Sequence, residues 1–255
     1  MKNSQPDKAV IVIGSGGIGA AVLRRLIREQ GTEADQPDAK TPATTIISIS
    51  RKDRDNAAAG HIHFTCDGSE AAISAVSHEL ASFCVTEIYL CTGFLHDQTR
   101  KPEKRVEDIG YDAMAHTLSI NTVLPALWLA HLVPLLAKQP PMQSVKFVVL
   151  SARVGSIADN SLGGWYSYRA SKAALNMILK TAAIELKRRA RQVKLVSFHP
   201  GTTDTALSKP FQRSVPKGKL FQPDFVAERL LWVSRSAEVN GELSYLDWDN
   251  KEIAW

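Results

Sequence analysis

Tyr168 and Lys172 are the two residues of this 255-residue chain whose types and spacing point most directly to chemistry. Four residues apart, they share one face of a helix, where a lysine ammonium lowers the pKa of a phenol from about 10. Such a tyrosine can give a proton to a carbonyl oxygen, or take one from an alcohol, near neutral pH. The same spacing is also common on ordinary helix surfaces, so the pair needs a context.

A glycine-rich turn supplies that context. Residues 14–19 read Gly-Ser-Gly-Gly-Ile-Gly, and they lie between an apolar run and a helical pattern. In G-x-G-x-x-G the first glycine permits a tight turn, the second lets a pyrophosphate approach the backbone, and the third lets helix and strand pack closely. The helix N-terminus then attracts phosphate. We predict a dinucleotide-binding turn formed by Gly14, Ser15, Gly16, Gly17, Ile18 and Gly19.

The end of the next strand indicates which dinucleotide is bound. An acidic residue there holds the ribose 2′-hydroxyl of NAD, whereas an arginine accommodates the 2′-phosphate of NADP. This chain has Arg51 directly after Ser50, and a guanidinium can stack on adenine while it holds the phosphate. We therefore predict NADP(H) over NAD(H), with Asp53 or Asp55 as the acidic residue of the alternative.

The elements that must position these residues alternate along the chain. Short apolar runs predict strands at residues 9–13, 44–50, 61–66, 87–91, 145–150, 195–198 and 243–246. Helical periodicity predicts helices at residues 18–28, 69–83, 105–137 (one helix or two), 166–189 and 223–234. Loops are expected at residues 32–43 and 208–220. This order predicts an α/β fold: a single Rossmann-type domain over residues 1–255, with a doubly wound parallel sheet of about seven strands and helices on both faces.

Composition excludes several classes of protein. Hydrophobic residues make up 44% and charged residues 22%, so the chain can fold, and a net charge of +5 is too small for a nucleic-acid footprint. Three cysteines are too few for a disulfide scaffold, and His61, His63 and Cys66 on one strand make poor zinc ligands. With no apolar segment of about 20 residues, we expect a cytoplasmic protein that binds no metal, membrane or nucleic acid.

Residues 168–176, Tyr-Arg-Ala-Ser-Lys-Ala-Ala-Leu-Asn, resemble the active-site helix of the short-chain dehydrogenase/reductase family. The resemblance extends along nearly the whole chain, through Leu90-Cys91-Thr92-Gly93, Asn121 in Ile-Asn-Thr-Val, and the Pro-Gly turn at residues 200–205. The stretches 155–160 and 163–165 and two C-terminal tryptophans are similar to the C-factor or sniffer-like carbonyl-reductase branch.

The resemblance implies an NADPH-dependent oxidoreductase that transfers a hydride to the carbonyl group of an aldehyde or ketone. Its substrate would be a small carbonyl compound or the corresponding alcohol. Tyr168 would deliver the proton, Lys172 would bind the ribose, and Asn121 would hold a relay water. Further cofactor contacts would come from Asp67, Thr92, Gly93, Pro200, Gly201, Thr203 and Thr205.

Two departures from the family pattern bear on this expectation. The glycine turn is one residue shorter than usual. The expected catalytic serine, the second of a Ser-Ser pair, is replaced in Ser151-Ala152. Ser151 is our candidate for the role, with Ser156 as the alternative. The change at Ala152 keeps a second function open: an NADP-binding protein with a signalling or sensing role and little turnover.

Two further expectations concern surfaces. Phe94, Trp165, Phe211 and Phe221 are candidates for an apolar substrate pocket, although core positions are an equal alternative. In the family, the helices that correspond to residues 109–137 and 166–189 build a dimer interface. We therefore expect a homodimer or homotetramer.

Overall fold

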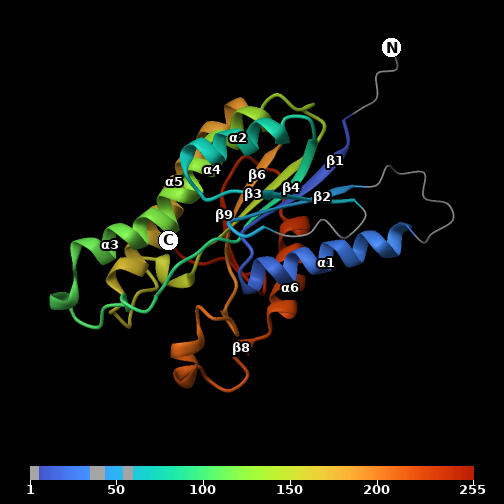
Figure 1. The fold of residues 1–255 in the computed structure, drawn as a ribbon. Coiled ribbons are helices and arrows are strands. Elements are labelled where there is room, and N and C mark those ends of the chain that lie inside the picture. The colour runs from blue at the N-terminus through green and yellow to red at the C-terminus, as the bar shows by residue number, and fades with distance from the viewer. Residues whose placement is uncertain (1–5, 35–43, 54–59) are drawn as a thin grey trace, which may run out of the picture.

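The computed structural model describes residues 6–34, 44–53 and 60–255. Its main sheet has seven parallel strands in the order β3-β2-β1-β4-β5-β6-β9 (Figure 1). These strands are β1 (Lys8–Ile13), β2 (Thr45–Ser50), β3 (His61–Thr65), β4 (Cys84–Leu90), β5 (Val145–Leu150), β6 (Val193–His199) and β9 (Ser244–Asp247). The predicted Rossmann-type α/β fold is confirmed.

Helices cover both faces of the sheet (Figure 1). One face carries α2 (Glu70–Leu80), α4 (Leu124–Leu136) and α5 (Tyr166–Arg189), and the other carries α1 (Gly17–Ala34) and α6 (Pro223–Ser236). Successive strand residues point to opposite faces, so β1 sends Ile11 into the first core and Val12 into the second. This double burial explains why the strands read as continuous apolar runs rather than alternating ones.

The strand order creates a crevice at one edge of the sheet. From β1, the third strand in this order, the chain moves outward through β2 to β3, then returns to pair β4 on the other side of β1. The loops that follow β1 and β4 therefore diverge at the carboxyl ends of these strands, which is where open α/β sheets bind ligands.

The predicted helical segment 105–137, given as one helix or two, is confirmed from Tyr111 to Leu136 but starts later than predicted. The chain forms a short 3₁₀ turn (Val106–Asp108), then α3 (Tyr111–Leu118), a π-turn (Ser119–Val123) and α4. Gly110 has extended backbone angles and separates the 3₁₀ turn from α3. By length and composition the run Tyr111–Leu136 could cross a membrane. In this fold, Trp128 and Leu132 of α4 lie in the core, which accounts for that apolarity.

Two predicted loops also differ from the structure. Helix α1 continues to Ala34, and residues 35–43 lie outside the described part of the chain. The segment 208–220 contains a 3₁₀ helix (Lys209–Ser214) and runs into β8 (Leu220–Phe221). Strand β8 pairs with β7 (Thr202–Thr203) in a separate two-stranded parallel sheet. This small sheet fixes the segment beside the crevice.

Candidate active site

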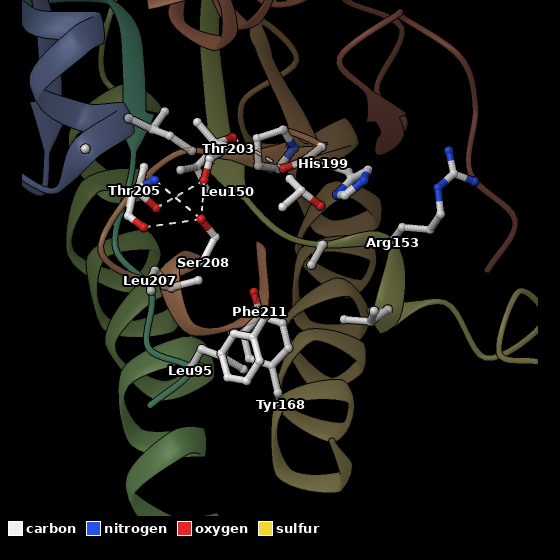
Figure 2. Close-up of a pocket in the computed structure, with 18 of the residues that line it drawn as sticks. Leu95, Leu150, Arg153, Tyr168, His199, Thr203, Thr205, Leu207, Ser208 and Phe211 are labelled. Atoms are coloured by element: carbon white, nitrogen blue, oxygen red, sulfur yellow. Dashed lines mark hydrogen bonds between the residues drawn. The ribbon is translucent and has the colours of Figure 1, made fainter. Parts of the chain in front are cut away.

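A cavity of about 550 Å³ lies at the carboxyl edge of the sheet, at the crevice described above. Its walls come from the turn after β1, the loops after β4, β5 and β6, helix α5 and the segment 204–219 (Figure 2). Most of the predicted site residues lie in this wall: Gly16, Gly17, Ile18, Thr92, Gly93, Ser151, Tyr168, Lys172, Pro200, Gly201, Thr203 and Thr205.

The glycine turn has the geometry that a phosphate group requires. Gly14 has φ +102°, and a Cβ on Gly19 would lie 2.1 Å from the Gly14 carbonyl oxygen, so both positions need glycine. A Cβ on Gly16 would meet nothing within 4 Å, which leaves open space beside this part of the wall. Helix α1 begins at Gly17, so its free N–H groups lie at the cavity. The shortened turn fits a pyrophosphate.

Tyr168 and Lys172 both line the cavity from α5. Burial raises the pKa of the Tyr168 phenol to about 12, with a smaller contribution from Tyr245, and burial lowers the pKa of Lys172 to about 7. The Lys172 Nζ donates to the Leu150 carbonyl oxygen over 2.8 Å. The tyrosine pKa that we predicted to fall is therefore raised, because burial dominates. Tyr168 keeps its proton at neutral pH.

Asn121 lies outside the cavity wall and connects two parts of it. The residue is fully buried in the π-turn, a helical irregularity that is frequent at functional sites. Its Oδ1 accepts from the Phe94 backbone N–H (2.7 Å), and its Nδ2 donates to the Phe94 carbonyl oxygen (2.8 Å) and to Ser171 Oγ (3.0 Å). Asn121 thus ties the loop after β4 to α5.

The two candidate serines make contacts within the protein. Ser151 lines the cavity, but its hydroxyl donates to Asn176 Oδ1 over 2.8 Å. Ser156 is buried away from the cavity wall, and its Oγ accepts from the Asp159 backbone N–H over 3.0 Å. Ala152 itself lines the cavity, and its carbonyl oxygen accepts from the Tyr245 hydroxyl over 2.6 Å. At the position expected for serine, the wall carries a methyl group.

The turn after β6 forms another part of the cavity wall and reaches the glycine turn, since a Cβ on Gly17 would lie 2.4 Å from the Thr205 side chain. Gly201 has φ +72°, and a Cβ there would lie 2.6 Å from the Phe221 ring, so both the backbone angle and the available space require glycine at this position. The Thr203 carbonyl oxygen accepts from the Ser208 hydroxyl over 2.5 Å, which anchors the start of the 3₁₀ helix (Figure 2). The Thr92 hydroxyl of the cavity wall is buried and has no hydrogen-bond partner among the described residues.

Arg51 and Asp67 lie outside the cavity wall, at the carboxyl ends of β2 and β3. Arg51 is exposed. Asp67 accepts from the Ser69 backbone N–H over 2.8 Å, and this hydrogen bond holds the pKa of the carboxyl below its usual value. Strand β2 adjoins β1 on the side opposite β4 and β3 follows β2, so Arg51 and Asp67 lie successively further from the glycine turn along this edge of the sheet.

Aromatic and aliphatic side chains form the part of the cavity beside Tyr168 (Figure 2). The Trp165 ring lies 5.0 Å from Phe211 and 6.0 Å from Tyr168, between ring centroids. Of the four predicted aromatic residues, Trp165 and Phe211 line the cavity, whereas Phe221 packs on Trp248. Phe94 packs edge-on against His116 instead. The wall is completed by residues without a sequence signal: Leu95, Val154, Leu207, Val215 and Pro216.

Glu103 holds the start of α5 and was not predicted. Its carboxylate accepts from both the backbone N–H (3.2 Å) and the hydroxyl of Ser167, and its carbonyl oxygen accepts from the Trp165 N–H over 2.6 Å. Trp165 has left-handed backbone angles and offers no side-chain cap. An anion at a helix N-terminus satisfies free N–H groups and interacts favourably with the helix dipole. Glu103 thus positions the first turn of α5, which carries Tyr168.

The histidines of β3 have structural contacts. Ser48 Oγ lies 2.9 Å from His61 Nε2 and 2.7 Å from His63 Nδ1, and His63 Nε2 lies 2.9 Å from the Lys52 carbonyl oxygen. Within residues 6–34, 44–53 and 60–255, no group of three or more histidine, cysteine or acidic side chains is arranged to hold a metal ion.

Residues 8–215 match the short chain dehydrogenase family. The chain belongs to this family. The matched region holds the glycine turn, the Tyr168–Lys172 pair and the turn after β6, so it covers almost the whole cavity wall.

Three curated relatives align with parts of this family member. A 1-hydroxy-2-glutathionyl-2-methyl-3-butene dehydrogenase from Rhodococcus sp. (strain AD45) is 37% identical over 106 residues, which cover 42% of this chain and 44% of the relative. C-signal of Myxococcus xanthus is 32% identical, with 58% of this chain and 82% of the relative covered. A benzil reductase of Bacillus subtilis is 29% identical, with 56% and 62% covered. The first and third alignments thus span less than two thirds of the relative.

Solved structures share the fold over nearly the full chain. An NADPH-bound carbonyl reductase from chicken fatty liver superposes with a TM-score of 0.78 at 20% identity, covering 98% of this chain and 99% of the other. The carbonyl reductase Sniffer of D. melanogaster gives a TM-score of 0.76 at 19% identity, covering 99% and 100%. The family match and the curated relatives identify an oxidoreductase of the short-chain type that is similar in sequence to C-signal, and the solved structures show that it shares the fold of carbonyl reductases such as Sniffer.

Proposed function

We propose that this oxidoreductase uses NADPH to reduce the carbonyl group of an aldehyde or ketone that carries an aryl substituent. The observation that carries the proposal is the position of Tyr168. Its phenol lines the same cavity as the glycine turn and the turn after β6, and it keeps its proton at neutral pH. The rings of Trp165 and Phe211 beside it suit an aryl group, in line with the name of the Bacillus relative.

The residues present fit a nicotinamide dinucleotide. Gly16, Gly17 and Ile18 would hold the pyrophosphate at the start of α1, and residues 200–205 would hold the nicotinamide amide. The unpartnered Thr92 hydroxyl between these two turns is available to a ligand. When bound, the cofactor supplies the hydride that reaches the carbonyl carbon.

The protein supplies the proton and the orientation. Tyr168 donates its hydroxyl proton to the carbonyl oxygen as negative charge develops there. The resulting phenolate is stabilised by Lys172 in its ammonium form, which is accessible because the lysine pKa lies near 7. Asn121 and Glu103 act at a distance: they fix α5 against the loops that complete the cavity.

The substitution Tyr168→Phe tests this assignment. It keeps the ring but removes the donated proton, so we expect NADPH binding within about twofold of wild type and turnover lowered by about 10³-fold or more. NADPH oxidation would be followed with benzaldehyde, benzil and an aliphatic ketone as substrates. Near-normal turnover in the variant would overturn the role of Tyr168.

Arg51 is proposed to select NADP over NAD. Because charge-assisted hydrogen bonds to phosphate contribute about 1.5–3 kcal/mol, Arg51→Ala should weaken NADPH binding about tenfold or more and leave NADH binding unchanged. Titration of both cofactors by fluorescence measures the two dissociation constants. Equal affinities for NADPH and NADH in the wild type would contradict the preference.

The likeness to C-signal favours a second candidate, an NADP-binding protein with a signalling role and little turnover. The methyl group of Ala152 at the expected serine position agrees with it. The assay above separates the two candidates: tight NADPH binding without turnover of any carbonyl substrate supports signalling, whereas turnover that is lost in Tyr168→Phe supports the reductase. For either function we expect a cytoplasmic homo-oligomer.

A further inference from the structure

A reduced carbonyl group needs hydrogen-bond donors at its oxygen. Negative charge develops on that atom as the carbon is attacked, and a donor already held in place stabilises the transition state. Tyr168 provides one donor. The place where the family resemblance predicts a second carries the methyl of Ala152, and the hydroxyls of Ser151 and Ser156 make contacts within the protein. A second donor must come from another part of the wall.

His199 is a polar residue of this wall with an unsatisfied atom. It is the last residue of β6 and lines the same cavity as Ala152 and Tyr168 (Figure 2). Its Nδ1 is buried and has no hydrogen-bond partner in the described structure. A buried ring nitrogen without a partner is costly, and at the wall of a cavity this cost is relieved by a ligand.

Two other polar side chains of the wall are less suited to this role than His199. The Arg153 guanidinium also lines the cavity, but it is held by Asp247 (2.9 Å) and Asp159 (3.5 Å). The Thr92 hydroxyl follows β4 next to the glycine turn, since a Cβ on Gly14 would lie 3.2 Å from the Thr92 nitrogen. Thr92 therefore belongs to the cofactor side of the cavity.

The ring of His199 is neutral under ordinary conditions. Burial, with a smaller contribution from Arg153, lowers the pKa of His199 to about 4. A neutral imidazole has one N–H donor and one acceptor nitrogen. It can therefore hydrogen-bond a carbonyl oxygen without adding a positive charge to the cavity wall.

We propose that His199 donates a hydrogen bond to the substrate carbonyl oxygen and so takes the role for which the family pattern predicts a serine at position 152. Hydride transfer and protonation by Tyr168 are unchanged; His199 keeps its proton and only stabilises the charge that develops on oxygen. This inference rests on the proposed reductase function.

The test compares wild type, His199→Ala, Ala152→Ser and the double variant in the benzil and NADPH assay. We expect His199→Ala to lower kcat by at least about tenfold, with an unchanged dissociation constant for NADPH, because a donor to the transition state is lost. Ala152→Ser should restore most of this loss in the double variant and raise kcat by a smaller factor in the wild-type background, where His199 already donates. His131→Ala, on the half-buried part of α4, is the control and should match wild type.

Two results would overturn the proposal. One is a kcat of His199→Ala within about twofold of wild type, and the other is an equal gain from Ala152→Ser in both backgrounds, which would mean that the two residues act independently. Should His199→Ala fail to fold, His199→Gln and His199→Leu replace it: the amide keeps a donor and should retain more activity than leucine. A wild type that binds NADPH but turns over no substrate would refute the reductase function, and this inference with it.

Discussion

At the scale of single residues, burial governs the site more than pairing does. Tyr168 and Lys172 share a helix face, as their spacing indicates, yet burial shifts the pKa values of both toward their neutral forms. At neutral pH, Tyr168 is therefore a neutral phenol, which is the protonation state from which the proposed reduction starts.

The lowered pKa of Lys172 predicts how the free energy of unfolding depends on pH. With a pKa lowered from 10.5 to about 7, Lys172 loses its proton in the folded protein at a lower pH than in the unfolded chain. Between these values the unfolded chain binds more protons, so the free energy of unfolding rises with pH, by up to about 5 kcal/mol from this group. We expect denaturant unfolding of wild type to show this rise from pH 7 to 10, and Lys172→Met to show a flatter profile.

The exposed Lys180, two turns further along α5, provides the matched control. Lys180→Met should retain the wild-type pH profile, because an exposed ammonium group is hydrated in both states. Parallel pH profiles for wild type and Lys172→Met would contradict the lowered pKa of Lys172 in the folded protein.

At the scale of elements, α5 depends on an anchor from a distant loop. The left-handed Trp165 before α5 and the carboxylate of Glu103 beside its first turn together set the angle at which the helix enters the site. Strained backbone at such a point persists only where its surroundings hold it. The same anchor therefore positions both Trp165 of the aromatic wall and the proton donor Tyr168.

Glu103→Ala should expose this dependence. It leaves the Ser167 N–H and hydroxyl without their acceptor, so we expect unfolding to be easier by about 1–3 kcal/mol and KM for an aryl substrate to rise. Glu103→Gln keeps an acceptor oxygen and should lose less. Glu107→Ala, at an exposed position four residues away, should match wild type in thermal unfolding and kinetics.

Sequence patterns predicted the strands and the main helices well. Helices buried on one face show regularly spaced apolar residues, and strands buried on both faces form continuous apolar runs. They missed β7 and β8, whose two-residue pairing is a backbone contact between segments far apart in the chain. They also missed Glu103, which acts through a helix end about 60 residues later. The glycine turn could be predicted because its constraints are local. The hydrogen bond from the Ser151 hydroxyl to Asn176 could not, because it depends on where the fold places Asn176.

At the scale of the whole molecule, α5 presents apolar side chains to solvent. Met177 is 66% exposed and Ile184 is 57% exposed, two turns apart along one helix. Apolar side chains that recur along an exposed helix are typical of an interface, and a two-fold axis would bury the same patch on both subunits.

Ile184→Glu should weaken such an interface by placing a charge in it, and we expect a shift from dimer or tetramer toward monomer in sedimentation at micromolar concentration. Met142→Glu, at a 96% exposed position away from α5, is the control and should sediment as wild type does. A wild type that sediments as a monomer at all concentrations would contradict the predicted assembly.

The strand order also has a consequence for how the chain is made. Strand β1 precedes β2 and β4 in the chain but lies between them in the sheet. Its second edge stays unpaired until residues 84–90 have emerged, and the last position, beside β6, is filled only by residues 244–247. Parallel pairings across such separations form slowly and leave apolar edges open to other chains meanwhile. During translation this oxidoreductase should therefore depend on chaperones that cover β1 until β4 arrives.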